Sequence, residues 1–100
     1  MKRGKLILVG VPIGNWDDIS PRALACLKSA HLILCEDTRE SSKLLLNYGL
    51  NVKLISYIGS ENSAVSAARK AIELGGDVAL ISDRGMPCIS DPGANLIRQF

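Results

Sequence analysis

The sequence has very few aromatic residues: one Trp, two Tyr and one Phe in 100 residues. Without large aromatic side chains, a hydrophobic core has to be built from Leu, Ile, Val and Ala. The charge is nearly balanced as well, with 12 basic and 10 acidic residues and a net charge of +2. This small excess of positive charge does not by itself indicate binding to nucleic acid or to a membrane surface.

Long hydrophobic runs and paired cysteines are also missing. No apolar run approaches the ~20 residues that a membrane span needs. The basic and then apolar stretch 2–9 is too short for a signal peptide and stops at Gly10, so it predicts a strand. Three cysteines without a CxxC pair favour neither a disulfide framework nor a metal site. We therefore expect a cytoplasmic protein with no membrane partner and no metal, in which Cys26 and Cys35 are small core residues.

What the sequence does contain is typical of one globular domain. Apolar residues make up 47% of the chain and charged residues 22%. A chain of this size buries roughly two thirds of its surface on folding, which is enough for an ordinary core. We expect residues 1–100 to form a single α/β domain.

Short aliphatic runs alternate with amphipathic segments along the chain. The aliphatic runs predict strands at 5–10, 32–35, 52–56 and 78–82. The amphipathic segments predict helices at 21–29, 39–48 and 61–74, and a last helix starting near Pro92. Ser20 and Thr38 are the expected N-caps, and glycines 49 and 75 the expected stops. Continuous apolar strands alternating with helices indicate a parallel sheet with helices on both faces, an αβα sandwich.

Polar and glycine-rich segments follow the strands rather than the helices. They are residues 10–15, 36–39, 57–62 and 82–93. Because parallel sheets bind ligands beyond the carboxyl ends of their strands, this asymmetry predicts a binding site there. The first segment has glycines spaced GxxxG, which matches neither GxGxxG nor a phosphate loop and is equally consistent with a simple tight turn.

The segment 82–93 is long for a strand-to-helix connection. Its backbone groups suit an adenine or a ribose, and Asp83 and Asp91 can accept hydrogen bonds from ribose hydroxyls. Asp91 can also cap the final helix. Two interpretations are likewise open for the segment Glu36–Arg39. It can supply a general base that an ion pair holds in place. Alternatively, Thr38 or Asp37 caps the helix, while Glu36 and Arg39 form a surface pair.

Three motifs together resemble one family. They are residues 8–24 (LVGVPIGNWDDISPRAL), residues 36–39 (EDTR), and residues 82–93 with the pattern SDxGxPxISDPG. In this order and spacing they resemble the ribosomal RNA small-subunit methyltransferase I family, within the tetrapyrrole methylase superfamily. The resemblance covers essentially the whole chain and implies the N-terminal domain of a tetrapyrrole-methylase-like fold.

The resemblance implies methyl transfer from S-adenosyl-L-methionine to a ribose 2′-hydroxyl of a cytidine in small-subunit ribosomal RNA. By position it implies an acceptor side formed by Asn15, Glu36, Asp37 and Arg39, with Asp37 as the base. It implies a cofactor side formed by Pro12, Ser82, Asp83, Arg84, Gly85, Met86, Ile89, Ser90 and Asp91. It further implies a second domain absent from this chain, a possible homodimer, and no activity for the isolated domain.

The chain departs from the family at Arg84, Met86 and Cys88, where Ala, Thr and Gly are usual, and at Ile58–Ser60, where a His is usual. Two other functions therefore stay open. One is a methylase of a tetrapyrrole or another small molecule. The other is a degenerate, non-catalytic domain for nucleotide binding or assembly.

Overall fold

The computed structural model describes residues 4–11, 19–58 and 61–83. The elements in chain order are β1 (Leu6–Val11), α1 (Pro21–Ser29), β2 (Leu32–Cys35), α2 (Thr38–Asn47), β3 (Lys53–Ser56), α3 (Glu61–Glu73) and β4 (Val78–Asp83). Every predicted strand and helix within these ranges is present, with ends that differ by one residue at most. The last helix, predicted from Pro92, lies outside the described residues.

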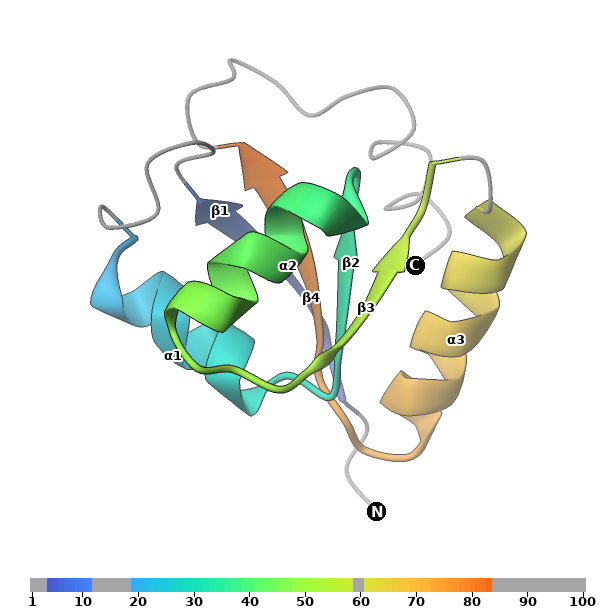
Figure 1. Cartoon of the computed structure of the whole chain (residues 1–100). Coiled ribbons are helices and arrows are strands. Elements are labelled where there is room, and N and C mark those ends of the chain that lie inside the picture. The colour runs from blue at the N-terminus through green and yellow to red at the C-terminus, as the bar shows by residue number, and fades with distance from the viewer. Residues whose placement is uncertain (1–3, 12–18, 59–60, 84–100) are drawn as a thin grey trace.

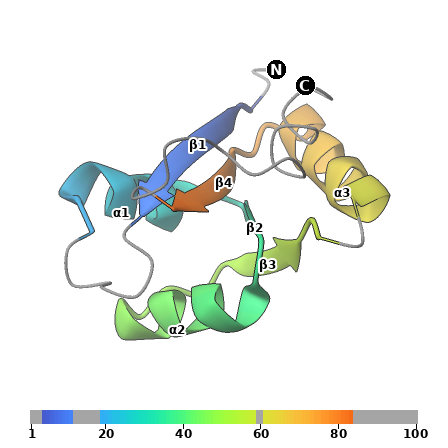
Figure 2. The ribbon, with the colours of Figure 1, turned by 90° about the horizontal axis from the view of Figure 1, so that it is seen from above.

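The four strands form one parallel sheet in the order β1-β4-β2-β3 (Figure 1). The chain therefore crosses the sheet in one direction through α1 and α2 and returns through α3. Since a crossover between parallel strands is nearly always right-handed, reversing the direction moves the connecting helix to the other face. The topology thus accounts for α1 and α2 on one face and α3 on the other (Figure 2).

Each face of the sheet has its own aliphatic core, because successive side chains of a strand point to opposite faces. Ile33 and Ala79 belong to the core under α1 and α2, together with Leu27 and Leu44 of those helices. Their strand neighbours Leu34 and Leu80 belong to the core under α3. The strands β2 and β4, which carry these residues, are thus buried on both sides, and this explains their unbroken apolar sequences. The predicted αβα sandwich is confirmed.

Local signals determine where the helices begin and end. The Ser20 hydroxyl accepts a hydrogen bond from the Ala23 amide at 3.1 Å, and Pro21 occupies the first helical position, as predicted. Gly49 and Gly75 follow α2 and α3 with φ angles of 66° and 91°. These left-handed conformations favour glycine and stop both helices.

Alanines of α3 allow close packing on the sheet. Ala64 and Ala68 are fully buried and Ile72 is almost so, whereas Val65 is half-buried at the edge of the same core. The buried side chains of α3 recur every four residues, at 64, 68 and 72, and so form one apolar face. Of the two cysteines expected in the core, Cys35 is buried and Cys26 half-buried.

Candidate functional site

All four strands of the described residues end at the same edge of the sheet, where the sequence predicts the site. β1 and β4 end side by side, with Gly10 opposite Ser82 and Val11 opposite Asp83. β2 lies on the other side of β4 and ends beside β3, with Cys35 opposite Ser56. The fold therefore brings the strands that lead into the predicted cofactor loops next to the strand that leads into the acceptor segment.

The structure describes only part of the predicted site. Glu36, Asp37 and Arg39 are described with their side chains. For Ser82 and Asp83 the structure gives the backbone, at the end of β4. The other predicted site residues lie outside the described residues: Pro12, Asn15, Arg84, Gly85, Met86, Ile89, Ser90 and Asp91.

Asp37 is the N-cap of α2, and its carboxylate accepts three hydrogen bonds from Arg39. Its Oδ1 accepts a hydrogen bond from the Arg39 backbone N–H at 2.9 Å. The guanidinium donates to the same oxygen from Nε at 3.4 Å and to Oδ2 from Nη2 at 3.5 Å. The backbone hydrogen bond first, and the guanidinium second, lower the pKa of Asp37 below its ordinary value of 3.8. The carboxylate is therefore ionised at neutral pH.

Two expectations for this segment are corrected. Thr38 does not cap α2 but is its first residue, because Asp37 already satisfies a free amide of the first turn. The ion pair of Arg39 is with Asp37 and not with Glu36. The Arg39 side chain is 87% exposed, so the pair lies at the surface. The alternative that Asp37 caps the helix is the one that the structure confirms.

Beyond the last paired residues of β2 and β3, two further hydrogen bonds join the two strands, and a third lies within the chain that leaves β3. The Tyr57 amide donates to the Cys35 carbonyl at 3.1 Å. The Ser56 hydroxyl donates to the Glu36 carbonyl at 2.8 Å and accepts from the Ile58 amide at 3.1 Å. Sequence reasoning did not select Ser56. The only signal was a hydroxyl at the end of an otherwise apolar run, which many strands share.

Cys35 is buried beneath this edge and is not a candidate nucleophile. Burial raises the pKa of its thiol, and the Asp37 carboxylate adds to that effect, while a hydrogen bond with Ser41 acts in the opposite direction. A raised thiol pKa disfavours the reactive thiolate. The Sγ atom lies 3.8 Å from the Ile55 carbonyl oxygen. The thiol therefore links β2 to β3 and to the first turns of α2.

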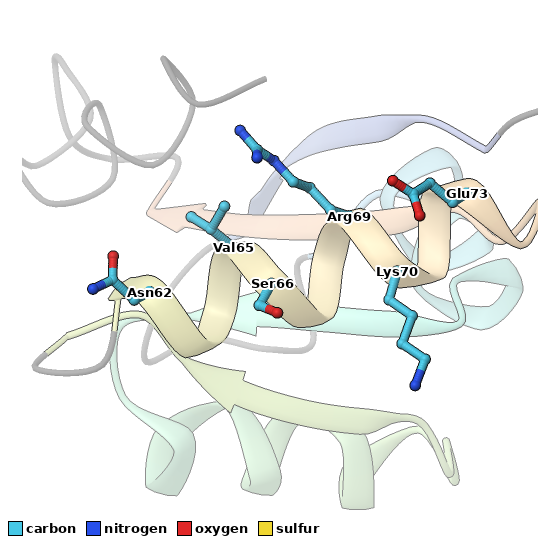
Figure 3. Close-up of a pocket in the computed structure, with 6 residues that line it drawn as sticks. All are labelled: Asn62, Val65, Ser66, Arg69, Lys70 and Glu73. Carbon is cyan, nitrogen blue, oxygen red and sulfur yellow. The ribbon is translucent and has the colours of Figure 1, made fainter.

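Two hollows are lined by described residues other than Glu36, Asp37 and Arg39. One, of about 490 Å³, lies along the outer side of α3 (Figure 3). In Figure 3 the Arg69 and Lys70 side chains point to different sides of the helix, so these cations do not converge on one ligand. The other, of about 240 Å³, lies between β1 and the beginning of α1.

The described part of the chain has neither a candidate metal cluster nor a helix that could span a membrane. Within residues 4–11, 19–58 and 61–83, no group of three or more His, Cys, Asp or Glu side chains could hold a metal ion. None of the helices in these ranges is long and apolar enough to cross a membrane.

The fold and a family match over almost the whole chain define a class of protein. The model of the family described as Tetrapyrrole (Corrin/Porphyrin) Methylases matches residues 5–100, and the chain belongs to this family. A solved structure of uroporphyrin-III-C-methyltransferase from Thermus thermophilus has a similar fold, with a TM-score of 0.68. It is 20% identical and the match covers 96% of this chain and 41% of the other, so the likeness concerns the fold alone.

Within the family, the chain is similar to proteins named ribosomal RNA small subunit methyltransferase I. It is 52% identical to that of Mycoplasmopsis pulmonis, over 95% of this chain and 43% of the relative. It is 46% identical to that of Thermotoga maritima, over 96% and 44%, and 45% identical to that of Pseudomonas aeruginosa, over 99% and 36%. These relatives confirm the resemblance predicted from the motifs. The chain spans less than half of their length.

Proposed function

We propose that this chain is the part of an S-adenosyl-L-methionine-dependent methyltransferase that forms the cofactor and acceptor edge for a cytidine 2′-hydroxyl of small-subunit ribosomal RNA. The observation that supports it best is the strand order β1-β4-β2, in which β4, the strand before segment 82–93, lies between β1 and the strand before the EDTR segment. The names of the relatives support a methyl transfer to small-subunit ribosomal RNA.

The cofactor side is formed by the ends of β1 and β4 and the segments that follow them. Val11 and Asp83 are paired at these ends, so a carboxylate-bearing residue stands at the last position of the edge. A carboxylate suits the hydroxyls of a ribose as a hydrogen-bond acceptor. S-adenosyl-L-methionine, when bound, supplies a methyl group on a sulfonium that is already a good donor. Pro12, the segment Ser82–Met86 and the segment Ile89–Asp91 are our candidates for its contacts.

The acceptor side is formed by Glu36, Asp37 and Arg39, with Asn15 as a further candidate. Asp37 is the proposed proton acceptor for the ribose hydroxyl. Its lowered pKa keeps it ionised at neutral pH but also makes it a weak base. Most of the rate acceleration must then come from alignment of the hydroxyl with the methyl donor rather than from basicity.

Less than half of each relative is matched, so a second domain would supply the other wall of the cofactor site. We propose that the 100 residues alone do not transfer methyl groups. A cytoplasmic location, the ribosomal subunit as partner and a homodimer complete the proposal.

Calorimetric titration and a chimera test the proposal. In the first experiment, S-adenosyl-L-methionine is titrated into the free chain. In the second, the chain replaces the matching part of the Thermotoga maritima relative to give a chimera. We expect the free chain to be inactive and the chimera to transfer labelled methyl groups to small ribosomal subunits, with the label on cytidine ribose after digestion to nucleosides. An inactive chimera beside an active parent, or label on the bases, would contradict the proposal.

Asp83→Ala tests the cofactor side. In the chimera, the variant should bind S-adenosyl-L-methionine more weakly by about tenfold, which corresponds to the loss of roughly one hydrogen bond to a charged group. Asp77→Ala, on the loop at the opposite end of β4, is the control and should bind the cofactor as the parent does. Equal affinity of Asp83→Ala and the control would refute the placement of the cofactor.

A further inference from the structure

We propose that Ser56 is a positioning residue, which holds the acceptor segment Glu36–Arg39 in its place by joining it to the end of β3. This inference rests on the proposed function of that segment as the acceptor side. Ser56 is the last residue of β3, opposite Cys35, the last residue of β2. It therefore lies where regular pairing stops, beside the point where the chain leaves β2 and turns toward α2.

The hydroxyl of Ser56 takes part in two hydrogen bonds at this point. It donates to the carbonyl of Glu36 at 2.8 Å, the shorter of the two. It accepts from the amide of Ile58 at 3.1 Å. A hydroxyl is suited to this position because it can donate and accept at once. One side chain thus connects the ends of β2 and β3 beyond their last paired residues.

Glu36 is the residue at which the chain bends away from the sheet. With its carbonyl held by Ser56, and the Cys35 carbonyl held by the Tyr57 amide at 3.1 Å, two successive peptide groups before Asp37 are anchored to β3. The direction in which Asp37 leaves the sheet is therefore determined by β3 as well as by β2. The Asp37 carboxylate then reaches the Arg39 amide as the cap of α2.

Ser56 matters for position more than for stability. The bond to Glu36 lies at an exposed place, where water can replace it at small cost in stability. Position is more demanding, because a displacement of about 1 Å can cost on the order of 100-fold in the rate of an aligned reaction. The loss of the Ser56 hydroxyl should therefore leave the fold intact and change the environment of Asp37.

The test compares Ser56→Ala and Ser56→Thr with Ser63→Ala, which removes a hydroxyl from the exposed side of α3. Ser56→Cys, nearly equal in size but weak in hydrogen bonding, is the second variant should alanine impair folding. In the 100-residue chain, NMR follows the titration of the Asp37 carboxyl and the hydrogen exchange of the Ile58 amide. In the described part of the chain the charged group that acts on Asp37 is Arg39 of α2, and the Asp37 carboxylate in turn acts on the Cys35 thiol of β2.

In Ser56→Ala and Ser56→Cys we expect the Ile58 amide to exchange at least tenfold faster and the pKa of Asp37 to rise toward 3.8. Ser56→Thr should restore both values. The inference is overturned if Asp37 and Ile58 behave in Ser56→Ala as they do in Ser63→Ala. These readouts need no ligand, so an inactive chimera beside an active parent would contradict the proposed function and leave this test intact.

Discussion

Asp37 shows how one residue can serve the fold and the site together. As the N-cap it satisfies the Arg39 amide, and as a carboxylate it binds the Arg39 guanidinium and lies favourably at the positive end of α2. The same bonds that fix its position lower its pKa and so its strength as a base. A residue placed in this way is better suited to orienting a hydroxyl than to removing its proton unaided.

Asp37→Asn should reduce stability in a manner that depends on pH. The pKa of Asp37 in the folded state is below its ordinary value of 3.8. The stabilising contribution of the charge is therefore complete above 3.8 and is lost as the pH falls through the folded-state pKa. Thermal unfolding followed by circular dichroism should show a lower Tm for Asp37→Asn at neutral pH, and equal Tm values at the most acidic pH.

Asp37→Ala separates the cap from the charge. Asparagine caps helices nearly as well as aspartate, whereas alanine does not. Asp37→Ala should therefore remain less stable than the parent even at acidic pH, where Asp37→Asn has become equal to it. A difference between the parent and Asp37→Asn that stays constant over the whole pH range would contradict the role of the charge.

At the scale of the element, short-range signals explain the boundaries that the sequence predicts. Ser20 with Pro21 determines the start of α1, and Gly49 the end of α2, because each acts on backbone groups within a few residues. The wrong choice between Thr38 and Asp37 has the same origin. Both residue types cap helices, and only the direction in which the chain leaves β2 decides between them.

Gly49→Ala should destabilise the protein by about 1 kcal/mol, because a left-handed φ is unfavourable for a residue with a Cβ atom. Steric contact with the rest of the described protein contributes nothing, since apart from Gly49 and its two chain neighbours no atom lies within 4 Å of the position that the Cβ would occupy. Gly49→Asn should cost less, because asparagine tolerates this conformation better. Urea unfolding measures the free energy of unfolding of both variants. The control is Ser42→Ala, on the exposed side of α2, which should stay within about 0.5 kcal/mol of the parent. Equal stability of Gly49→Ala and Ser42→Ala would contradict the explanation.

At the scale of the whole molecule, the sheet order decides which apolar residues are buried. Leu8 and Leu80 are direct neighbours on β1 and β4 and face the same side of the sheet. Leu80 lies on an inner strand under α3 and is 1% exposed, whereas Leu8 lies on the outer strand β1 and is 54% exposed. The two strands look equally apolar in the sequence.

Leu80→Ala should therefore cost about 2–5 kcal/mol of unfolding free energy, the usual range for a leucine removed from a packed core. Leu8→Ala should cost less than about 1 kcal/mol, since its side chain is more than half exposed to water already. Chemical denaturation of the two variants makes a matched comparison, because the two leucines face the same side of the sheet and are paired with each other. Similar losses for both would show that β1 is covered in solution and that the assigned burial of Leu8 is wrong.

The sequence by itself determined the elements, the two-faced core and the family. Strand runs, caps and stop glycines act over a few residues, and the three motifs are contiguous segments, so each can be read without knowing the fold. Only the tertiary structure decided the strand order β1-β4-β2-β3 and the hydrogen bond from Ser56 to Glu36. It also decided that Arg39 pairs with Asp37 and not with Glu36. The order and the Ser56 bond join residues that are distant in the chain, 20 positions apart for Ser56 and Glu36 and 72 for Val11 and Asp83. The choice of partner for Arg39 follows from the bend at Glu36, which β3 helps to hold. Contacts between distant residues depend on how the helices pack across the sheet. A pattern within a short segment of sequence therefore cannot predict them.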